Sequence, residues 1–403
     1  MRTTWISAVA GTLVVGLIAA APRGKPAPSP KVDYKELAHR LVAQTAGIHA
    51  GDLVLVTGGT RDLELLEDVA AEVARVGGHP LIAIGSDRLT RLMYDDVPAK
   101  YDAGAAAFDM KLAGFVTAII AVDYNESPGV LEGVPPARLA ARAKTGATVD
   151  ALLRQRRVRV VAMGNDLYPT TARAEQFGVS QDQLAEVFWS GVNVDYAALQ
   201  ATGEKLRRAL AAGRKVRITN PNGTDVTVGI AGRPVYVSDG VISPADVRRG
   251  GAATTAWLPA GEVFVAPVPA TAQGTVVADR YFFQGKTIEN LRLEFKAGRL
   301  VSMTARTGLE PLKALYDAAG RGRDLFGVVD IGINPSVSLI PGSRMVGWMP
   351  AGMVTVGVGN NTWAGGSNSV GFGVDPFLPG STLSVDGRVI VQNGTLQAEV
   401  ARR

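Results

Sequence analysis

Hydrophobic residues follow two different patterns along the chain, and the change between them suggests two regions. In the first half, continuous apolar runs lie within residues 51–59, 79–87, 115–123 and 158–164, and helical segments separate them. Buried strands that alternate with helices are typical of a parallel sheet covered on both faces. We therefore expect residues 34–213 to form an α/β N-terminal domain with a mostly parallel sheet.

The last helices of this region are marked by capping residues. Ser180 and Gln183 have the spacing of a capping box and begin a long helical stretch that ends near Gly213. Gly191 and Asn193 are two places at which this stretch could break.

The second half of the chain has the pattern of antiparallel strands. Residues 215–240 predict short alternating strands joined by Asn-Gly and Asp-Gly turns. One helix is expected near residues 310–320. The remaining strand-like segments are residues 275–277, 291–295, 354–358 and 388–391. We expect residues 214–403 to form a mostly antiparallel α+β C-terminal domain.

The N-terminus has the composition of an export signal. Residues 1–21 begin with Arg2, continue through an apolar run at residues 5–18 and end in three alanines. These are the features of a secretory signal peptide, which would make the mature chain periplasmic or extracellular. An uncleaved membrane anchor is the alternative, because the run is nearly long enough to span a bilayer. Residues 22–33 are rich in Pro and form the predicted linker.

Composition and charge exclude several classes of function. The 403-residue chain has a net charge of +5, but it has no dense Lys/Arg run and no basic stripe with interleaved aromatics, so we expect no nucleic-acid partner. The absence of Cys excludes disulfides, thiolate zinc sites and cysteine nucleophiles. The three histidines, His39, His49 and His79, lack the spacing of metal ligands. All three lie in the N-terminal domain, so the C-terminal domain cannot build a Ser-His-Asp triad alone. The Gly58-Gly59 turn lacks both nucleotide-binding glycine patterns.

Three carboxylates in the C-terminal domain border glycine-rich or apolar segments. They are Glu262 in "AGEVFVAP", Asp330 in "GVVDIGINP" and Asp375 in "GFGVDPF". Carboxylates at strand ends can converge on a hard metal ion. Three unrelated turn or cap residues would give the same pattern, and the residues alone do not decide between these readings.

A second candidate is the segment "GNNTWAGGSNS" at residues 359–369, which is rich in amides and hydroxyls. Such a loop could bind a ligand, or it could bind its own backbone. The candidate ligand-binding residues are Asn360, Asn361, Asn368 and Ser369.

Several longer motifs occur in a familiar order. They are "LAHRLVAQTAGIHAGDLVLVTGG", "KVRITNPNGTDVTVGIAGRP", "LPAGEVFVAPVPATAQGTVVADR", "IENLRLEFKAGRLVSMTA" and "GVVDIGINPSV". The most specific is the third, which is similar to Pro-x-Gly-Glu-Val-Phe-x-x-Pro followed by Gly-Thr-Val. Together they resemble the metallo-aminopeptidase family of aminopeptidases T and S, also called thermophilic metalloproteases, from about Tyr34 to the C-terminus.

The resemblance implies a two-domain homodimer that removes N-terminal residues from peptides. Its C-terminal domain would hold two metal ions, commonly zinc, cobalt or magnesium, which activate water. The implied ligands are two Glu, two His and an Asp, with an assisting Tyr. Glu262 stands at the first Glu position and Asp375 at the Asp position. Val328 aligns with the second Glu, and Asp330 is the nearby carboxylate.

The chain departs from the family at both histidine positions. Thr355 stands at the first and Gly373 at the second, and no residue matches the assisting Tyr. Without imidazole, an all-oxygen site would suit magnesium, calcium or manganese better than zinc.

Two hypotheses follow from this comparison. In the first, an exported metal-dependent aminopeptidase uses Glu262, Asp330 and Asp375 as oxygen ligands for a divalent ion (Zn, Co, Mn or Mg), or uses Glu262 as general base. In the second, a catalytically degenerate homologue keeps the fold and binds a peptide or small molecule through residues 359–369.

Overall fold

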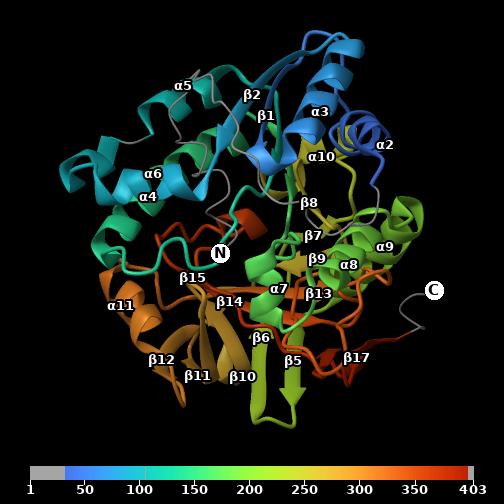
Figure 1. Cartoon of the computed structure of the whole chain (residues 1–403). Helices are drawn as coiled ribbons and strands as arrows, with labels where there is room; N and C mark the ends of the chain where they lie inside the picture. The colour runs from blue at the N-terminus through green and yellow to red at the C-terminus, as the bar shows by residue number, and fades with distance from the viewer. Residues whose placement is uncertain (1–31, 105, 398–403) are drawn as a thin grey trace.

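The computed structural model describes residues 32–104 and 106–397 (Figure 1). The predicted export signal at residues 1–21 and most of the predicted linker at residues 22–33 lie outside the described residues. Within the described ranges, no helix is both long enough and apolar enough to cross a membrane.

Sheet A is parallel and has helices on both faces, which confirms the predicted α/β region. Its strands lie in the order β2-β1-β3-β4-β8. The inner strands β3 and β4 are buried along their whole length, as their continuous apolar sequences require. The last strand, β8, comes from beyond residue 213, so the chain returns to sheet A after its first antiparallel hairpin. The bounds are β1 Leu53–Gly59, β2 His79–Gly85, β3 Ala118–Val122, β4 Arg159–Met163 and β8 Thr255–Leu258.

Helices connect these strands and cover the sheet. The predicted capping box of Ser180 and Gln183 is present at the start of α8. The predicted long helical stretch is two helices, because α8 ends at Val192, with Asn193 as its C-cap, and the Asp195 carboxylate caps α9. The α-helices are α2 Tyr34–His39, α3 Leu63–Arg75, α4 Asp87–Asp95, α5 Ala107–Phe115, α6 Pro136–Gln155, α7 Thr171–Phe177, α8 Gln181–Val192, α9 Tyr196–Ala212, α10 Pro244–Arg249 and α11 Glu310–Ala318.

Two antiparallel sheets form the remainder, which confirms the predicted α+β region. In Figure 1 sheet C lies below sheet A, and most of sheet B lies at the bottom. Sheet B has the order β12-β11-β10-β6-β5-β16-β17-β18, with β5 Lys215–Asn220, β6 Thr224–Gly229, β10 Gln273–Phe283, β11 Lys286–Lys296, β12 Arg299–Thr304, β16 Thr382–Val385, β17 Arg388–Gln392 and β18 Thr395–Leu396. Sheet C has the order β15-β14-β13-β9-β7, with β7 Val235–Ser238, β9 Glu262–Val265, β13 Phe326–Gly332, β14 Val354–Gly359 and β15 Gly373–Val374.

The two antiparallel sheets differ in burial. Strand β5 of sheet B alternates exposed and buried residues, so one face of this sheet meets solvent. Strands β9, β13 and β14 of sheet C are buried at every position, so both of its faces are covered. Sheet C is therefore an interior layer, and the side chains on β9, β13 and β14 are isolated from bulk water.

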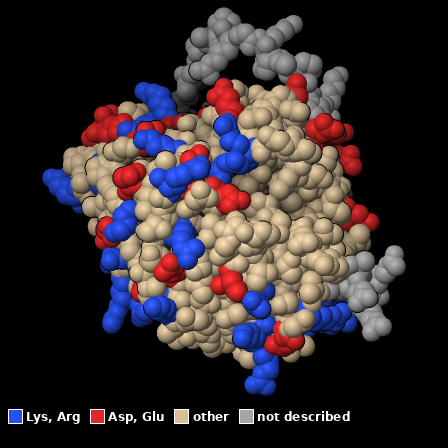
Figure 2. Space-filling view, turned by 90° about the horizontal axis from the view of Figure 1, so that it is seen from below, with Lys and Arg blue, Asp and Glu red and all other residues tan. Residues whose placement is uncertain are grey.

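Charged side chains of both signs are mixed on the outer surface. Figure 2 shows Lys and Arg beside Asp and Glu across the lower face. An example is the ion pair between Arg217 of β5 and Asp225 of β6, whose Nη2 and Oδ2 atoms are 2.8 Å apart. Exposed pairs of this kind contribute little to stability, so the fold depends on its apolar interior.

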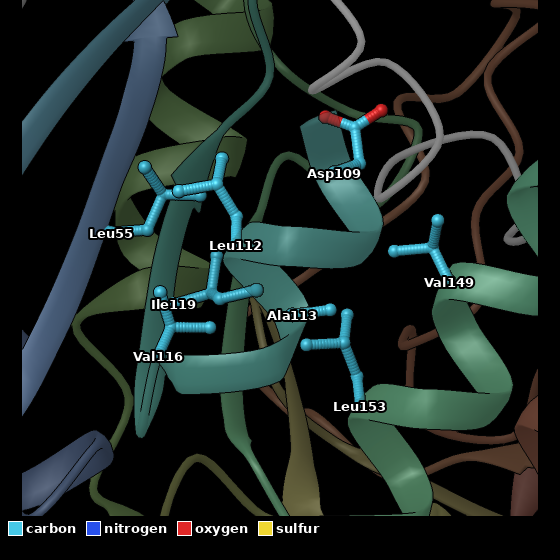
Figure 3. A pocket seen from close by; sticks show the side chains of 8 residues that line it. All are labelled: Leu55, Asp109, Leu112, Ala113, Val116, Ile119, Val149 and Leu153. Atoms are coloured by element: carbon cyan, nitrogen blue, oxygen red, sulfur yellow. The ribbon is translucent and has the colours of Figure 1, made fainter. Parts of the chain in front are cut away.

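One apolar core runs through sheets A, B and C, and a smaller core lies between sheet A and helices α5 and α6. Figure 3 shows a small cavity in the smaller core, with Asp109 of α5 beside Leu112 and Val149. The Asp109 side chain is buried, and its Oδ1 has no hydrogen-bond partner among the described residues. Burial raises the pKa of Asp109 to about 6.

Candidate active site

Glu262 is placed by a short connection between sheet A and sheet C. Strand β8 ends at Leu258 and β9 begins at Glu262. Gly261 in this connection has a φ of 124°, and a Cβ atom there would lie 2.6 Å from the Cβ of Asn334. Only glycine fits such a position. The connection thus fixes where Glu262 enters the sheet, and the residue is fully buried (0 % exposed).

Glu262, Asp330 and Thr355 lie on one face of sheet C. Gly332 of β13 pairs with Glu262, and Asp330, two residues earlier, pairs with Thr355 of β14. Residues that are opposite or two positions apart point to the same face of a sheet. The two carboxylates are therefore diagonal neighbours in the interior of the protein, since Asp330 is also 0 % exposed.

Asn165 binds the Glu262 carboxylate from sheet A. It belongs to the turn that follows β4, in which Asn165 and Asp166 have φ values of 44° and 63°. The Asn165 Nδ2 donates to Glu262 Oε1 at 2.6 Å and to the Pro259 carbonyl oxygen at 3.2 Å. In the same turn, Asp166 Oδ2 accepts from Trp348 Nε1 at 3.0 Å. This turn therefore fastens the carboxyl edge of sheet A to the face of sheet C that carries Glu262.

Asn165 was not among the residues predicted from the sequence, although a signal for it exists. The turn "GND" directly follows the buried strand predicted at residues 158–164. Polar groups beyond the carboxyl ends of parallel strands gather at one edge of the sheet, which is where such folds place their sites.

Asp375 lies at the other end of the same face. Its Oδ1 is 2.6 Å from the position that a Cβ on Gly357 would take, so only glycine leaves room for this carboxylate. Gly357 pairs with Val328, the residue at the second implied Glu position. Tyr281 of β10 is buried beside Asp375, and burial followed by the charge of Asp375 raises the pKa of Tyr281. Asp375 is thus next to an aliphatic and an aromatic side chain.

Aromatic side chains occupy much of the space around these residues. Phe264 lies beside Asp330 in the sheet, and its ring centroid is 5.4 Å from that of Trp363. Trp348 in turn packs against Trp363 at 5.6 Å and against Phe377 at 5.3 Å. These rings therefore form an aromatic cluster that extends from Phe264, next to Asp330, to Phe377.

The residues present do not fit a centre with two metal ions. Thr355 is fully buried on β14, and its hydroxyl oxygen has no hydrogen-bond partner within the described ranges. Gly373 begins β15 and has no side chain to offer as a ligand. Throughout residues 32–104 and 106–397, no three His, Cys, Asp or Glu side chains are grouped so that they could hold a metal ion. The site at Glu262, Asp330 and Asp375 remains a prediction.

The amide-rich loop at residues 359–369 uses most of its side-chain amides on its own fold. Asn361 Nδ2 donates to the Gly327 carbonyl at 3.1 Å, and its Oδ1 accepts from the Asn368 backbone N–H at 2.9 Å. Asn368 Nδ2 donates to the carbonyls of Gly322 and Gly359. Two candidates remain available for a ligand.

These two candidates differ in exposure. The Asn360 Nδ2 is buried without a hydrogen-bond partner among the described residues, and Ser369 is exposed. A ligand that reached the loop would therefore meet the Ser369 hydroxyl directly, and it would have to displace neighbouring side chains to reach Asn360.

The crevice between β1 and β3 is filled by protein side chains. This is the switch point of sheet A, where an open parallel sheet commonly binds its ligand. Arg61 spans it and donates to the carbonyls of Asp123, Tyr124 and Asn125. A Cβ on Gly59 would lie 3.2 Å from the Cβ of Tyr124. Burial raises the pKa of the Asp123 carboxyl to about 7.

A separate cavity of about 320 Å³ lies where the start of α6 meets α11 and the β10–β11 turn. Its walls are mainly apolar and include Leu139 and Leu315. At its rim, Lys286 Nζ and Glu132 Oε1 are 2.8 Å apart. The volume is at the lower end of the range for small-molecule sites.

Comparison with known proteins places these observations in a family context. A family described as "Thermophilic metalloprotease (M29)" matches residues 31–327. The match includes Glu262 and ends within β13, before Asp330, Thr355 and Asp375. No curated protein matches the chain.

Two solved structures share the fold. Wild-type AmpT from Thermus thermophilus is 20% identical, with a TM-score of 0.68, and the alignment covers 90% of this chain and 98% of that one. A 2,5-dihydroxypyridine dioxygenase from Pseudomonas putida KT2440 is 14% identical, with a TM-score of 0.58, and the alignment covers 93% of this chain and 100% of that one. At such identities the similarity shows a shared fold and leaves the reaction open.

Proposed function

The chain belongs to the thermophilic metalloprotease (M29) family, and from this premise we propose that it is a peptide-binding member whose two-metal aminopeptidase centre has been lost. One observation carries the proposal: Thr355 and Gly373 stand where the family resemblance implies histidine. The histidines that the chain has cannot replace them, because all three precede β3. His39, for example, bonds through Nδ1 to Glu72 at 2.8 Å.

The state of Glu262 supports the same proposal. Glu262 Oε1 accepts a short hydrogen bond from the Asn165 amide, which joins the turn after β4 of sheet A to β9 of sheet C. Glu262 then has a structural role, as the group that joins the two sheets.

Peptide binding would use the groups that remain available on the C-terminal half. Ser369 and the Asn360 amide can bond to a peptide backbone, whose N–H and C=O groups are neutral donors and acceptors. The aromatic rings of Trp348 and Trp363 would report such binding, because they lie close to the loop.

The test measures metal, turnover and binding on one preparation. The untagged chain is expected to contain far less than one metal ion per copy, and to leave leucyl and alanyl chromogenic amides intact with added Zn, Co, Mn or Mg. A dipeptide such as leucyl-alanine is expected to change the tryptophan fluorescence in a saturable way. Turnover that depends on a metal and disappears in Glu262→Ala, but not in the exposed control Glu67→Gln, would overturn the proposal.

A second candidate function is a metal-dependent aminopeptidase with oxygen ligands. The observation in its favour is that Glu262, Asp330 and Asp375 are all buried, at 0 %, 0 % and 6 % exposure. Carboxylate oxygens are the ligands that hard divalent cations prefer. Manganese or magnesium would suit such ligands better than zinc or cobalt. The experiment above separates this candidate from the first, because only the second predicts turnover.

We also propose that residues 1–21 direct export of the chain. The support is the basic start, apolar run and alanine triplet of that segment. N-terminal sequencing of the protein recovered from its natural source tests this, and a mature chain that begins near residue 22 is the expected result. Recovery of the uncleaved chain in the membrane fraction would favour the anchor.

A further inference from the structure

The cavity between the start of α6, helix α11 and the β10–β11 turn has the features of a small-molecule site. We propose that it binds a free α-amino acid with an apolar side chain. Glu132 binds the ammonium group of this ligand, Lys286 binds its carboxylate, and the walls hold its side chain. The inference is independent of the proposed peptide binding, because none of the described residues that line the cavity belongs to residues 359–369.

The cavity lies between the two halves of the chain. Residues 132–136 and Leu139 line it from the first half, and Pro311 and Leu315 of α11 line it from the second, together with Lys286 at the β10–β11 turn. In Figure 1, α11 lies between the helices of the first half and the strands of sheet B. Ligands commonly bind where two packed units meet, and a volume of about 320 Å³ suits a ligand of small size.

The segment that carries Glu132 is held in place by its backbone. Glu132 N donates to the Gly129 carbonyl oxygen at 2.8 Å, and Arg91 Nη1 of α4 donates to the Glu132 carbonyl oxygen at 2.9 Å. Pro135 and Pro136 follow, and the ring of each fixes its φ. This wall is therefore formed before a ligand arrives, and little conformational freedom is lost on binding.

Lys286 is placed by a tight hairpin turn. Phe283 pairs with Lys286, and the two residues between them have φ values of 49° and 77°, as in a two-residue type I′ turn. A Cβ on Gly285 in this turn would lie 3.0 Å from the Cα of Gly129. The turn thus packs against the segment that carries Glu132, and the two charged residues are held by neighbouring backbones.

The charges of these two residues match those of a free amino acid. Lys286 Nζ and Glu132 Oε1 are 2.8 Å apart, and their side chains are 53 % and 55 % exposed. The ammonium and carboxylate groups of an α-amino acid are attached to one carbon, so they are close neighbours as well. Beside this pair each charge of the ligand can meet its opposite. An exposed ion pair contributes little to stability, so the ligand can share its partners at small cost.

The remaining walls select the side chain of the ligand. Among the described residues that line the cavity, only Glu132 and Lys286 are charged. Val134 and Leu315 are buried, and Leu139 is partly buried. Burial of apolar surface against such walls is favourable, whereas a polar side chain would lose its contacts with water. We therefore expect an aliphatic amino acid such as leucine to bind more tightly than serine.

A ligand series tests which groups are recognised. By isothermal titration calorimetry, leucine is expected to bind the full chain in a saturable way. Isocaproate lacks the ammonium group and leucinamide lacks the carboxylate, so each should bind at least roughly tenfold more weakly than leucine. Serine, which keeps both charges and lacks the apolar side chain, should also bind at least roughly tenfold more weakly.

Two substitutions on α11 test the location. Ala314 is exposed and lines the cavity, so Ala314→Phe should fold, fill the space and weaken leucine binding at least roughly tenfold. Ala318 is exposed on the same helix and does not line the cavity, so Ala318→Phe is the matched control and should bind leucine as the wild type does. Circular dichroism checks that both variants keep the fold.

Substitutions of the ion pair test the two roles separately. Glu132→Gln should weaken the binding of leucine and not that of isocaproate, and Lys286→Gln should weaken the binding of leucine and not that of leucinamide. Glu294→Gln is the control, because it removes an ion pair of similar exposure with Arg292 on the same strand.

Three results would overturn the proposal. They are the absence of saturable leucine binding up to about 10 mM, leucine binding that Ala314→Phe leaves unchanged, and isocaproate or leucinamide binding as tight as that of leucine. None of them bears on the proposed peptide binding, which is measured with leucyl-alanine through tryptophan fluorescence.

Discussion

The hydrogen bond from Asn165 to Glu262 can be tested by changing Asn165 in two ways. Asn165→Gly removes the amide and tolerates the φ of 44° without strain. Asn165→Ala removes the same amide and also places a Cβ in the left-handed region. The difference between the two variants therefore separates the hydrogen bond from the backbone conformation.

The expected magnitudes follow from the geometry. A hydrogen bond to a charged acceptor contributes about 1.5–3 kcal/mol, and the short 2.6 Å contact is fully buried. A non-glycine residue in the left-handed region costs about 1–2 kcal/mol. Asn165→Gly should lower the free energy of unfolding by about 1.5–3 kcal/mol, and Asn165→Ala by about 2.5–5 kcal/mol.

The assay is urea unfolding at pH 7.5, followed by tryptophan fluorescence. A double-mutant cycle with Glu262→Leu should give a coupling free energy of about 1.5–3 kcal/mol. Asn290→Ala is the matched control, because Asn290 is an exposed residue with a φ of 49° and should report the backbone strain alone. The amide does not hold Glu262 if the free energy of unfolding of Asn165→Gly is within about 0.5 kcal/mol of the wild-type value, or if the coupling free energy is near zero. Either result would show that the structural role assigned to this pair is wrong.

Three further predictions concern single side chains. Burial raises the pKa of Asp109 to about 6, so the folded state binds its proton more tightly than the unfolded state. The ionised Asp109 should therefore lower the free energy of unfolding by an amount that grows as pH rises from about 4 to 7 and then levels off. After allowance for partial solvent access, the free energy of unfolding of Asp109→Asn relative to wild type should rise by about 1–2 kcal/mol over that range in urea titrations, and a flat difference would contradict this. Gly261→Ala should lower the free energy of unfolding by more than about 3 kcal/mol in the same assay, because it combines a φ of 124° with a Cβ only 2.6 Å from the Cβ of Asn334. Gly232→Ala, whose added Cβ meets no atom within 4 Å, should lower it by about 1 kcal/mol. Gly373→His should fold, because a Cβ added at residue 373 meets no atom within 4 Å. The variant should bind Co²⁺ about tenfold more tightly than the wild type, as measured by visible absorption. Unchanged affinity would mean that neither Asp375 nor Thr355 faces the new imidazole.

The sequence predicted the parts of the fold that depend on local patterns. The strands at residues 53–59 and 159–163 and the capping box at Ser180 follow from apolar runs and capping chemistry over a few residues. The return of β8 to sheet A could not be predicted, because the short and mainly apolar segment "TAWL" suits any buried strand.

For the site, sequence reasoning found the buried carboxylates and missed what surrounds them. Glu262, Asp330 and Asp375 were singled out by their glycine-rich contexts, and all three are buried. The bond from Asn165 to Glu262 joins residues 97 positions apart, and the packing of Trp348 on Trp363 likewise depends on tertiary contacts. Such contacts have no signature within a window of sequence.

The position of β8 has a consequence for how the protein is made. When a ribosome has released residues 34–213, four strands of sheet A are present, but the outer edge of β4 has nothing to pair with. Asn165 at that stage has neither the Pro259 carbonyl nor the Glu262 carboxylate to bind. Completion of sheet A must wait until residue 258 has emerged, after the β5–β6 hairpin has already been synthesised. The nascent N-terminal half is therefore a partly open sheet during translation, and it is the later half of the chain that closes it.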